Sequence, residues 1–186
     1  MTHQTLSSER LIIRKFHAQD WKDVYDYLSK EDVVAFEPYG VQSESECQKI
    51  ALQRSEDDSF WAVWLKSNQK VIGNLYFNQL IPTEFRAWET GYVFNSDFHH
   101  QGFAAESCKT LLDYAFDALS VRRVVAHCNP ENTASWKLLE RLKFRREGHF
   151  MKAAFFNKDN KGNKGNPLWH DAFQYAILKE EWHGSV

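Results

Sequence analysis

The chain has 186 residues, and 23 Lys and Arg against 25 Asp and Glu leave a net charge of −2 at pH 7. That length is enough for one domain with a complete core, and the near-neutral balance argues against a nucleic-acid-binding protein, whose surface is basic. The aromatic content is high, with 7 Trp, 7 Tyr and 14 Phe. These rings either fill a core or line a substrate cleft, and composition does not decide between the two.

Hydrophobic periodicity predicts alternating strands and helices along the chain. The first half is expected to form a strand, two helices and three strands, at residues 10–16, 20–28, 43 onward, 60–65, 70–77 and 86–95. The second of these helices begins with SESE, a capping box in which Ser43 and Glu46 satisfy each other's backbone donors. The second half is expected to form a helix, a strand, a helix and two strands, at residues 104–119, 121–128, 132–142, 144–157 and 169–178. This order predicts a single α/β domain, with a late hairpin connection at residues 157–167.

The spacing of the cysteines and the length of the apolar segments predict the cellular compartment of the protein. Cys47, Cys108 and Cys128 form no CxxC pair, and their odd number favours reduced thiols in a cytosol. The first 16 residues hold no apolar stretch of signal-peptide length, and no apolar run approaches the ~20 residues that span a bilayer. The sequence therefore predicts a cytoplasmic protein that does not act in a membrane.

The segment at residues 94–107, FNSDFHHQGFAAES, carries the clearest chemical signal. A strand ends, Gly102 lies in a turn, and a long helix begins with the small residues Ala104 and Ala105. The first turn of a helix has unpaired N–H groups and a partial positive charge, so small residues there allow a phosphate to approach. The alternative is that Gly102 only allows a tight turn into a core helix. No P-loop or dinucleotide-binding motif occurs in the sequence.

Several segments in the correct order resemble the GNAT acyl-CoA N-acetyltransferase superfamily. HHQGFA resembles the Q/R-x-x-G-x-G/A motif of the family, and NTAS followed by LLERLKF resembles its second conserved segment. The segments SERLIIRKFHAQDW, KVIGNLYF and WHDAFQYAILKEEW resemble the branch that acetylates the amino termini of ribosomal proteins. Two residues depart from the pattern: His99 stands where the family prefers Gln or Arg, and Lys143 stands where it prefers Gly. Lys143 predicts a different turn before Phe144.

The resemblance implies one N-acetyltransferase domain over residues 1–186, with its core at about 7–182. Its α/β fold is a mixed, mostly antiparallel sheet with splayed central strands, flanked by helices. Acetyl-CoA is the implied co-substrate, with its pantetheine arm between the strand ending at Phe94 and the strand at residues 121–128. The implied cofactor-binding residues are Phe94, Gln101, Gly102, Phe103, Ala104, Ala105, Asn132 and Lys137. For Lys137 the alternative is a solvated helix face.

Acetyl transfer requires a neutral amine, so a general base is expected. The resemblance makes Glu89 that candidate, and the alternative is an exposed strand carboxylate. Many family members carry a tyrosine as general acid where this chain has Leu139, whereas the resembled branch uses the serine at position 135. Ser135 is therefore the candidate proton donor to the CoA thiolate, and the alternative is a helix serine that bonds to the main chain.

The acceptor is expected to lie among carboxylates and aromatic rings. The candidate substrate-binding residues are Phe36, Glu37, Tyr39, Trp88 and Tyr92, with Phe155 and Trp169 as further wall residues. The sequence thus predicts transfer of acetyl from acetyl-CoA to a primary amine, of a protein N-terminus or a small molecule, by direct attack in a ternary complex. The histidines lack metal-ligand spacing, so no metal is expected. The alternative function is a non-catalytic acyl-CoA sensor. The final strand, if exposed, also allows a homodimer.

Overall fold

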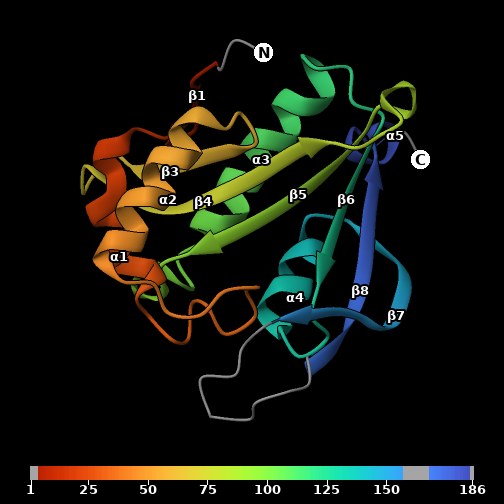
Figure 1. Ribbon diagram of the computed structural model, residues 1–186. Coiled ribbons are helices and arrows are strands. Elements are labelled where there is room, and N and C mark those ends of the chain that lie inside the picture. The colour runs from red at the N-terminus through yellow and green to blue at the C-terminus, as the bar shows by residue number, and fades with distance from the viewer. Residues whose placement is uncertain (1–3, 157–167, 185–186) are drawn as a thin grey trace.

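The computed structural model describes residues 4–156 and 168–184 and shows an open, twisted sheet with helices on both faces (Figure 1). The predicted connection at residues 157–167 lies outside the described residues. The 8 strands have the order β1-β2-β3-β4-β5-β6-β8-β7. Their bounds are β1 Leu6–Ser7, β2 Leu11–Lys15, β3 Phe60–Leu65, β4 Lys70–Gln79, β5 Ala87–Phe94, β6 Arg123–Cys128, β7 Arg145–Phe156 and β8 Leu168–Leu178.

In the described part of the chain, five α-helices connect or follow the strands, and they match the expected helices apart from a short one at the end. Their bounds are α1 Trp21–Leu28, α2 Glu44–Glu56, α3 Phe103–Asp117, α4 Thr133–Arg141 and α5 Lys179–Trp182. The capping box of α2 is confirmed, because Ser43 N donates to Glu46 Oε2 at 2.7 Å and Glu46 N donates to Ser43 Oγ at 3.4 Å. Within the described ranges, no helix is both long and apolar enough to cross a membrane.

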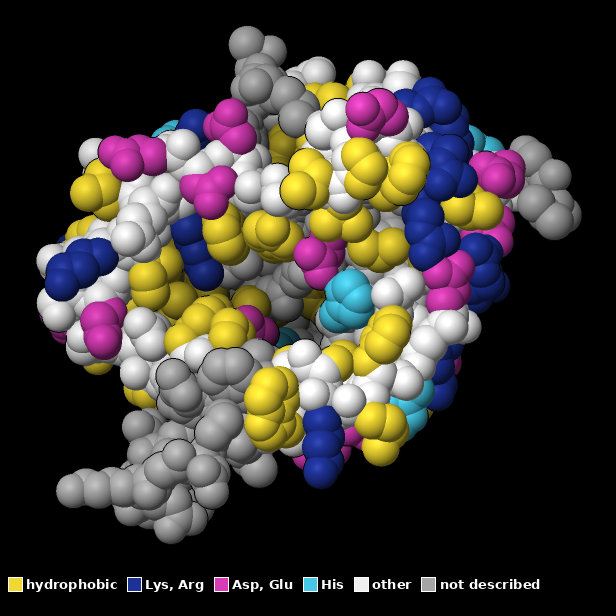
Figure 2. Space-filling model, turned by 45° about the vertical axis from the view of Figure 1, so that its right-hand side comes forward, with side chains coloured by type: hydrophobic (Ala, Val, Ile, Leu, Met, Phe, Trp, Pro, Cys, Tyr) yellow, Lys and Arg dark blue, Asp and Glu magenta, His cyan; other side chains and the backbone are white. Residues whose placement is uncertain are grey.

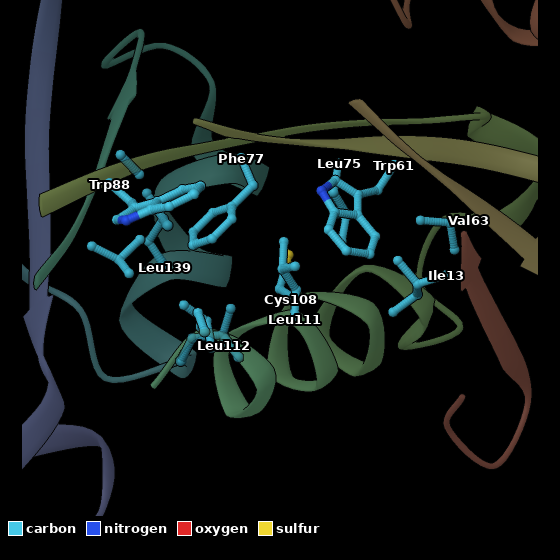
Figure 3. Close-up of a cluster of buried hydrophobic side chains, with 14 of the residues drawn as sticks. Ile13, Trp61, Val63, Leu75, Phe77, Trp88, Cys108, Leu111, Leu112 and Leu139 are labelled. Atoms are coloured by element: carbon cyan, nitrogen blue, oxygen red, sulfur yellow. The ribbon is translucent and has the colours of Figure 1, made fainter. Parts of the chain in front are cut away.

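Two hydrophobic clusters fill the space on either side of the sheet. The alternation of side chains along β3 sends Ala62 to the face covered by α1 and α2, and Trp61 and Val63 to the face covered by α3. The α3 side is the larger cluster, and Figure 3 shows Leu111 and Leu112 of the helix beneath the strands. Most of the aromatic residues therefore belong to the core.

The central strands β5 and β6 are the one parallel pair, and their pairing is short. It runs from Ala87 opposite Arg123 to Glu89 opposite Val125. Beyond that point β5 stays paired with β4 as far as Phe94, and β6 stays paired with β8 as far as Cys128. The two strands therefore diverge, as Figure 1 shows, and the expected splayed sheet is confirmed.

The final strand is not an exposed edge. β8 pairs with β6 on one side and with β7 on the other, so β7 is the outer strand. The expectation that the final strand offers a free edge to a second copy is therefore wrong, because the last two strands of the chain insert in reverse order. The sequence order of a hairpin does not reveal which of its strands lies on the outside.

The turn after α4 corrects a second expectation. Lys143 has φ +68°, the left-handed conformation that glycine adopts most easily. Phe144 N donates to Leu139 O and Lys143 N donates to Glu140 O, both at 3.0 Å, which makes a Schellman cap. The turn thus has the shape that a glycine would form, and the prediction of a different turn is wrong.

Candidate active site

The N-terminus of α3 presents unpaired backbone amides beside the gap between β5 and β6. Gly102 precedes the helix with φ +83°, and the first bond of the helix runs from Glu106 N to Gly102 O at 3.0 Å. The amides of the three residues between them, Phe103, Ala104 and Ala105, have no partner within the helix. These amides and the helix dipole form a site for an anionic group.

Arg10, the residue before β2, holds this helix end in place. Its Nη1 donates to Gln101 O at 3.0 Å, its Nε donates to Glu106 Oε2 at 2.7 Å, and its guanidinium lies 4.4 Å from the centre of the Phe103 ring. Burial alone would raise the pKa of Glu106, but hydrogen bonds from Ser8 and Arg10 lower it. The start of α3 is therefore fixed by contacts that are distant in sequence.

A cavity of about 510 Å³, which we call the amide cavity, lies against this helix end. Seven of the predicted cofactor-binding residues line it, namely Phe94, Gly102, Phe103, Ala104, Ala105, Asn132 and Lys137. Gln101 is not among the lining residues, because its carbonyl accepts from Arg10 and its side chain donates to Asp97 O. Arg141, which was not predicted from the sequence, lines the cavity one turn after Lys137. The i, i+4 spacing of the two cations was the available signal.

The main chain at Phe94 faces the gap between the strands. Asn95 N donates to Ile72 O of β4 at 2.9 Å, and hydrogen-bonded pairs alternate along an antiparallel ladder. The amide of the preceding residue, Phe94, is therefore directed away from β4 and toward the gap. The Phe94 carbonyl oxygen lies 3.1 Å from His99 Nε2, so the histidine ring is held by the main chain while it lines the amide cavity.

A second cavity of about 440 Å³, the carboxylate cavity, lies on the other side of the gap, between β5, β6 and the segment after α1. The predicted substrate residues Phe36, Glu37, Tyr39 and Tyr92 line it, as do both catalytic candidates, Glu89 and Ser135. Figure 2 shows a hollow on this side of the molecule, surrounded by hydrophobic, acidic and histidine side chains. The two cavities share six lining residues, which are Phe36, Glu37, Tyr92, Val93, Asn132 and Ser135.

Trp88 does not belong to this site, and its prediction is wrong. The side chain is 7% exposed and stacks on Phe77, with ring centres 4.6 Å apart, in the core above α3 (Figure 3). Trp88 and Tyr92 point to the same face of β5, but Trp88 lies where β6 still pairs and Tyr92 lies where the strands have parted. Of the further wall residues, Trp169 is exposed and does not line the cavity, and the Phe155 side chain lies outside the described residues.

Glu89 is paired with a histidine from the neighbouring strand. Glu89 Oε1 lies 2.8 Å from His127 Nδ1, and His127 Nε2 lies 3.3 Å from Gln174 Oε1 of β8. The hydrogen bond to Glu89 raises the pKa of His127. His127 was not predicted to be a site residue. His127 lies two residues after Val125, on the same face of β6, and Val125 is paired with Glu89. Only this parallel register shows that His127 lies near Glu89, so the sequence alone could not indicate it.

Ser135 lies at the junction of the two cavities in a hydrogen-bonded group. The Tyr92 hydroxyl donates to Ser135 O at 2.9 Å and lies 3.0 Å from Ser135 Oγ. Asn132 caps α4 by accepting from Ser135 N at 3.1 Å, which leaves its NH₂ group as the donor that it can offer a ligand. Burial raises the pKa of Tyr92, so its hydroxyl is neutral.

Comparisons with known proteins agree with this geometry. The acetyltransferase (GNAT) domain family matches residues 10–145. The uncharacterized N-acetyltransferase YnaD of Bacillus subtilis (strain 168) is 32% identical over 96% of this chain and 99% of its own. The [ribosomal protein uS5]-alanine N-acetyltransferase of Escherichia coli (strain K12) is 24% identical over 95% of this chain and 92% of its own.

A solved structure shows the same fold at similar identity. The crystal structure of the GNAT-family acetyltransferase from Bacillus anthracis superposes with a TM-score of 0.83 at 32% identity, covering 95% of this chain and 99% of that chain. Among the described residues, no group of three or more His, Cys, Asp or Glu is placed to hold a metal ion. The site is thus an amide-lined cavity joined to a carboxylate-lined one, and the chain belongs to the GNAT family of acetyl-CoA-dependent N-acetyltransferases.

Proposed function

We propose that the protein transfers the acetyl group of acetyl-CoA directly to a primary amine, of a protein N-terminus or a small molecule, in a ternary complex. The observation that carries the proposal is the junction of the two cavities at shared residues, which include Ser135 and Tyr92. One cavity offers amides and cations to phosphates, and the other offers carboxylates to an amine. Both substrates therefore have room at the same time.

The amide cavity suits the polar parts of acetyl-CoA. The pyrophosphate accepts hydrogen bonds from the amides of Phe103, Ala104 and Ala105, and Lys137 and Arg141 add positive charge at the same cavity. The pantetheine arm lies in the gap, where the Phe94 amide donates to it and Asn132 offers its NH₂ group. This arrangement brings the thioester to the junction.

The Glu89–His127 pair is the proton acceptor on the amine side. An ammonium group has no lone pair, so its proton passes to the pair, directly or through water, before the amine attacks. The new C–N bond forms as the C–S bond breaks, and the electron pair of the C–S bond remains on sulfur. The acylated nitrogen then carries one proton too many, and this proton reaches the thiolate through the Ser135 hydroxyl, which gives its own proton to sulfur and takes the one from nitrogen. Ser135 is held in place for this relay by the Tyr92 hydroxyl.

The cysteine at the site argues against an acetyl-cysteine intermediate. Of the three cysteines, Cys128 lines the carboxylate cavity. A nucleophilic cysteine must be a thiolate, but burial raises the pKa of Cys128 to about 11. The thiol therefore stays protonated at neutral pH, and this supports direct attack by the amine.

The test is an acceptor screen that also detects a non-catalytic acyl-CoA sensor. Purified protein is titrated with acetyl-CoA by calorimetry and then assayed for CoA thiol release with amino-terminal peptides and small primary amines. We expect binding together with amine-dependent thiol release and an acetylated product seen by mass spectrometry. Binding without release above background for any amine would identify the sensor, and the absence of acetyl-CoA binding would contradict both functions.

A further inference from the structure

Arg54 is a buried cation in the wall of the carboxylate cavity. It lies on the buried stripe of α2 together with Cys47 and Ala51, and the residue is 7% exposed. Its side chain crosses from the helix to the sheet and lines the cavity beside Asn74 and Phe60. A charged residue at this depth requires a partner that compensates its charge.

The polar neighbours of Arg54 are neutral. Its Nη1 donates to the Tyr27 hydroxyl at 3.1 Å and to Asn74 Oδ1 at 3.0 Å. Burial raises the pKa of Tyr27 to about 12 and also raises the pKa of Tyr39, whose hydroxyl bonds to Arg54. Both tyrosines are therefore uncharged at neutral pH, and they orient the guanidinium without balancing it.

No carboxylate compensates the guanidinium within the described parts of the chain. Arg54 makes no ion pair within 4.0 Å with any described Asp or Glu, although Glu37 and Glu89 line the same cavity. A guanidinium has five N–H donors, and the two bonds to Tyr27 and Asn74 both use Nη1. The Nη2 and Nε groups therefore remain for Tyr39 and for a ligand in the cavity.

We propose that Arg54 binds a carboxylate of the acceptor, so that the amine substrate is one that also carries a carboxylate group. This inference deepens the proposed function and rests on it. The planar fork of a guanidinium matches a carboxylate with two parallel hydrogen bonds. One cation balances one negative charge, whereas a phosphate dianion would bring an excess of charge into a cavity that Glu37 and Glu89 already line.

The spacing along the sheet fits an acceptor with two charged ends. Asn74, which contacts Arg54, is paired with Val93, and Asn78 is paired with Glu89. Asn74 and Asn78 are four positions apart along β4, which corresponds to about 13 Å between their Cα atoms. Gly91 lies between them with no side chain, and a Cβ there would meet only Tyr76 Cβ at 3.7 Å. No side chain at Gly91 blocks the cavity between the two positions. The carboxylate of the acceptor therefore lies toward Arg54, and its amine lies toward the Glu89–His127 pair.

The test compares acceptors that differ only in this charge. Matched pairs are a long-chain ω-amino acid against its carboxamide, and amino-terminal peptides with Glu against Gln at the second residue. The two pairs distinguish a small molecule from a peptide. For the wild type we expect kcat/KM to be roughly tenfold or more higher for the carboxylate member of one pair. Arg54→Met, which keeps an unbranched side chain, is expected to bring that ratio to about one.

A matched control removes an arginine elsewhere. Arg14 bonds to Asp20, at 2.8 Å, and does not line the cavity. Arg14→Met is therefore expected to leave the ratio of the two acceptors unchanged. A wild type without preference for carboxylates, or an Arg54→Met variant that lowers both acceptors equally, would overturn the inference and leave Arg54 with a structural role.

A binding measurement separates this inference from the proposed function. N-acetyl amino acids and their carboxamides are titrated into the CoA complex of each variant, and melting temperature checks that the variants are folded. We expect the acid to bind more tightly than the amide in the wild type and equally in Arg54→Met. Failure of turnover with every amine would contradict the proposed function, whereas equal binding of acid and amide to the wild type would contradict the role of Arg54.

Discussion

The two cavities meet at the same strand gap but are built in different ways. The amide cavity is formed largely by main-chain groups at the start of α3 and at Phe94. The carboxylate cavity is formed by side chains from the segment after α1 and from α2, β4, β5 and β6, and its acidic and basic side chains are Glu37, Arg54, Glu89 and His127. Every residue except proline supplies a backbone amide, whereas a charge requires a particular side chain. The difference teaches that the fold itself supplies the donors of the amide cavity, whereas the carboxylate cavity depends on the residue types at its wall.

The carboxylate cavity has the residue whose loss is expected to have the largest effect. Glu89→Gln keeps the shape of the side chain but removes its charge, so we expect turnover to fall by roughly 100-fold or more. Acetyl-CoA affinity, measured by calorimetry, is expected to stay the same because the amide cavity is untouched. Glu84→Gln, on an exposed segment outside both cavities, is the control. Equal turnover of Glu89→Gln and the wild type across pH would remove Glu89 as the base.

A negative charge introduced at the start of α3 tests whether the amide cavity binds the phosphates of acetyl-CoA. Ala105→Asp is expected to stabilise the helix end by about 0.3–1 kcal/mol, yet to repel the phosphates and weaken acetyl-CoA binding by roughly tenfold. Ala105→Asn, of the same size without the charge, is the control and is expected to bind more tightly than Ala105→Asp. If the two variants bind acetyl-CoA equally, the phosphates do not lie at this helix end.

The Glu89–His127 pair gives the carboxylate cavity a pH dependence. Glu89 raises the pKa of His127 above its ordinary value of 6.5. Because the raised pKa belongs to the folded state, the stabilisation is fully present below pH 6.5 and is lost as the pH rises through the folded-state value. Glu89→Gln is expected to lower the His127 pKa toward 6.5 in an NMR titration. An unchanged pKa would show that the two side chains do not interact in solution.

The smallest effect is expected outside both cavities. Lys143 has φ +68°, and replacement by glycine relieves this left-handed conformation. Lys143→Gly is expected to stabilise the fold by about 1 kcal/mol and raise the melting temperature by about 2–4 °C, with turnover unchanged. Lys143→Ala keeps the strain and is the control. A lower melting temperature for the glycine variant would mean that the lysine side chain makes a stabilising contact of its own.

Local patterns account for most of what could be predicted. The capping box at Ser43, the helix expected at 104–119 and the strand expected at 121–128 each depend on neighbours in sequence, and the structure has them at Ser43, Phe103–Asp117 and Arg123–Cys128. The candidate anion site at the start of α3 followed from a local signal too, because a helix N-terminus after a glycine exposes amides wherever it lies. The other candidate cofactor-binding residues came from the resemblance to the family. Gln101 is the exception, since its carbonyl group accepts a hydrogen bond from Arg10, which is distant in sequence.

The residues that sequence reasoning misplaced depend on contacts between distant segments. Trp88 became a core residue because β6 still pairs with β5 at that point. His127 became part of the site because the same pairing brings β6 beside Glu89. Neither outcome follows from the hydrophobic periodicity of the sequence. The side chains of β5 alternate in the same way where β6 is paired with it and where β6 has diverged from it.

The sequence by itself determined the order of strands and helices, the exposed amides at the start of α3 and the family, since each depends on residues that are close along the chain. Only the tertiary structure decided which rings line the acceptor cavity, that Glu89 is paired with His127, and that Arg54 lies buried beside Asn74. The physical reason is that the divergence of β5 and β6 creates the site, and that divergence is a relation between strands more than 30 residues apart.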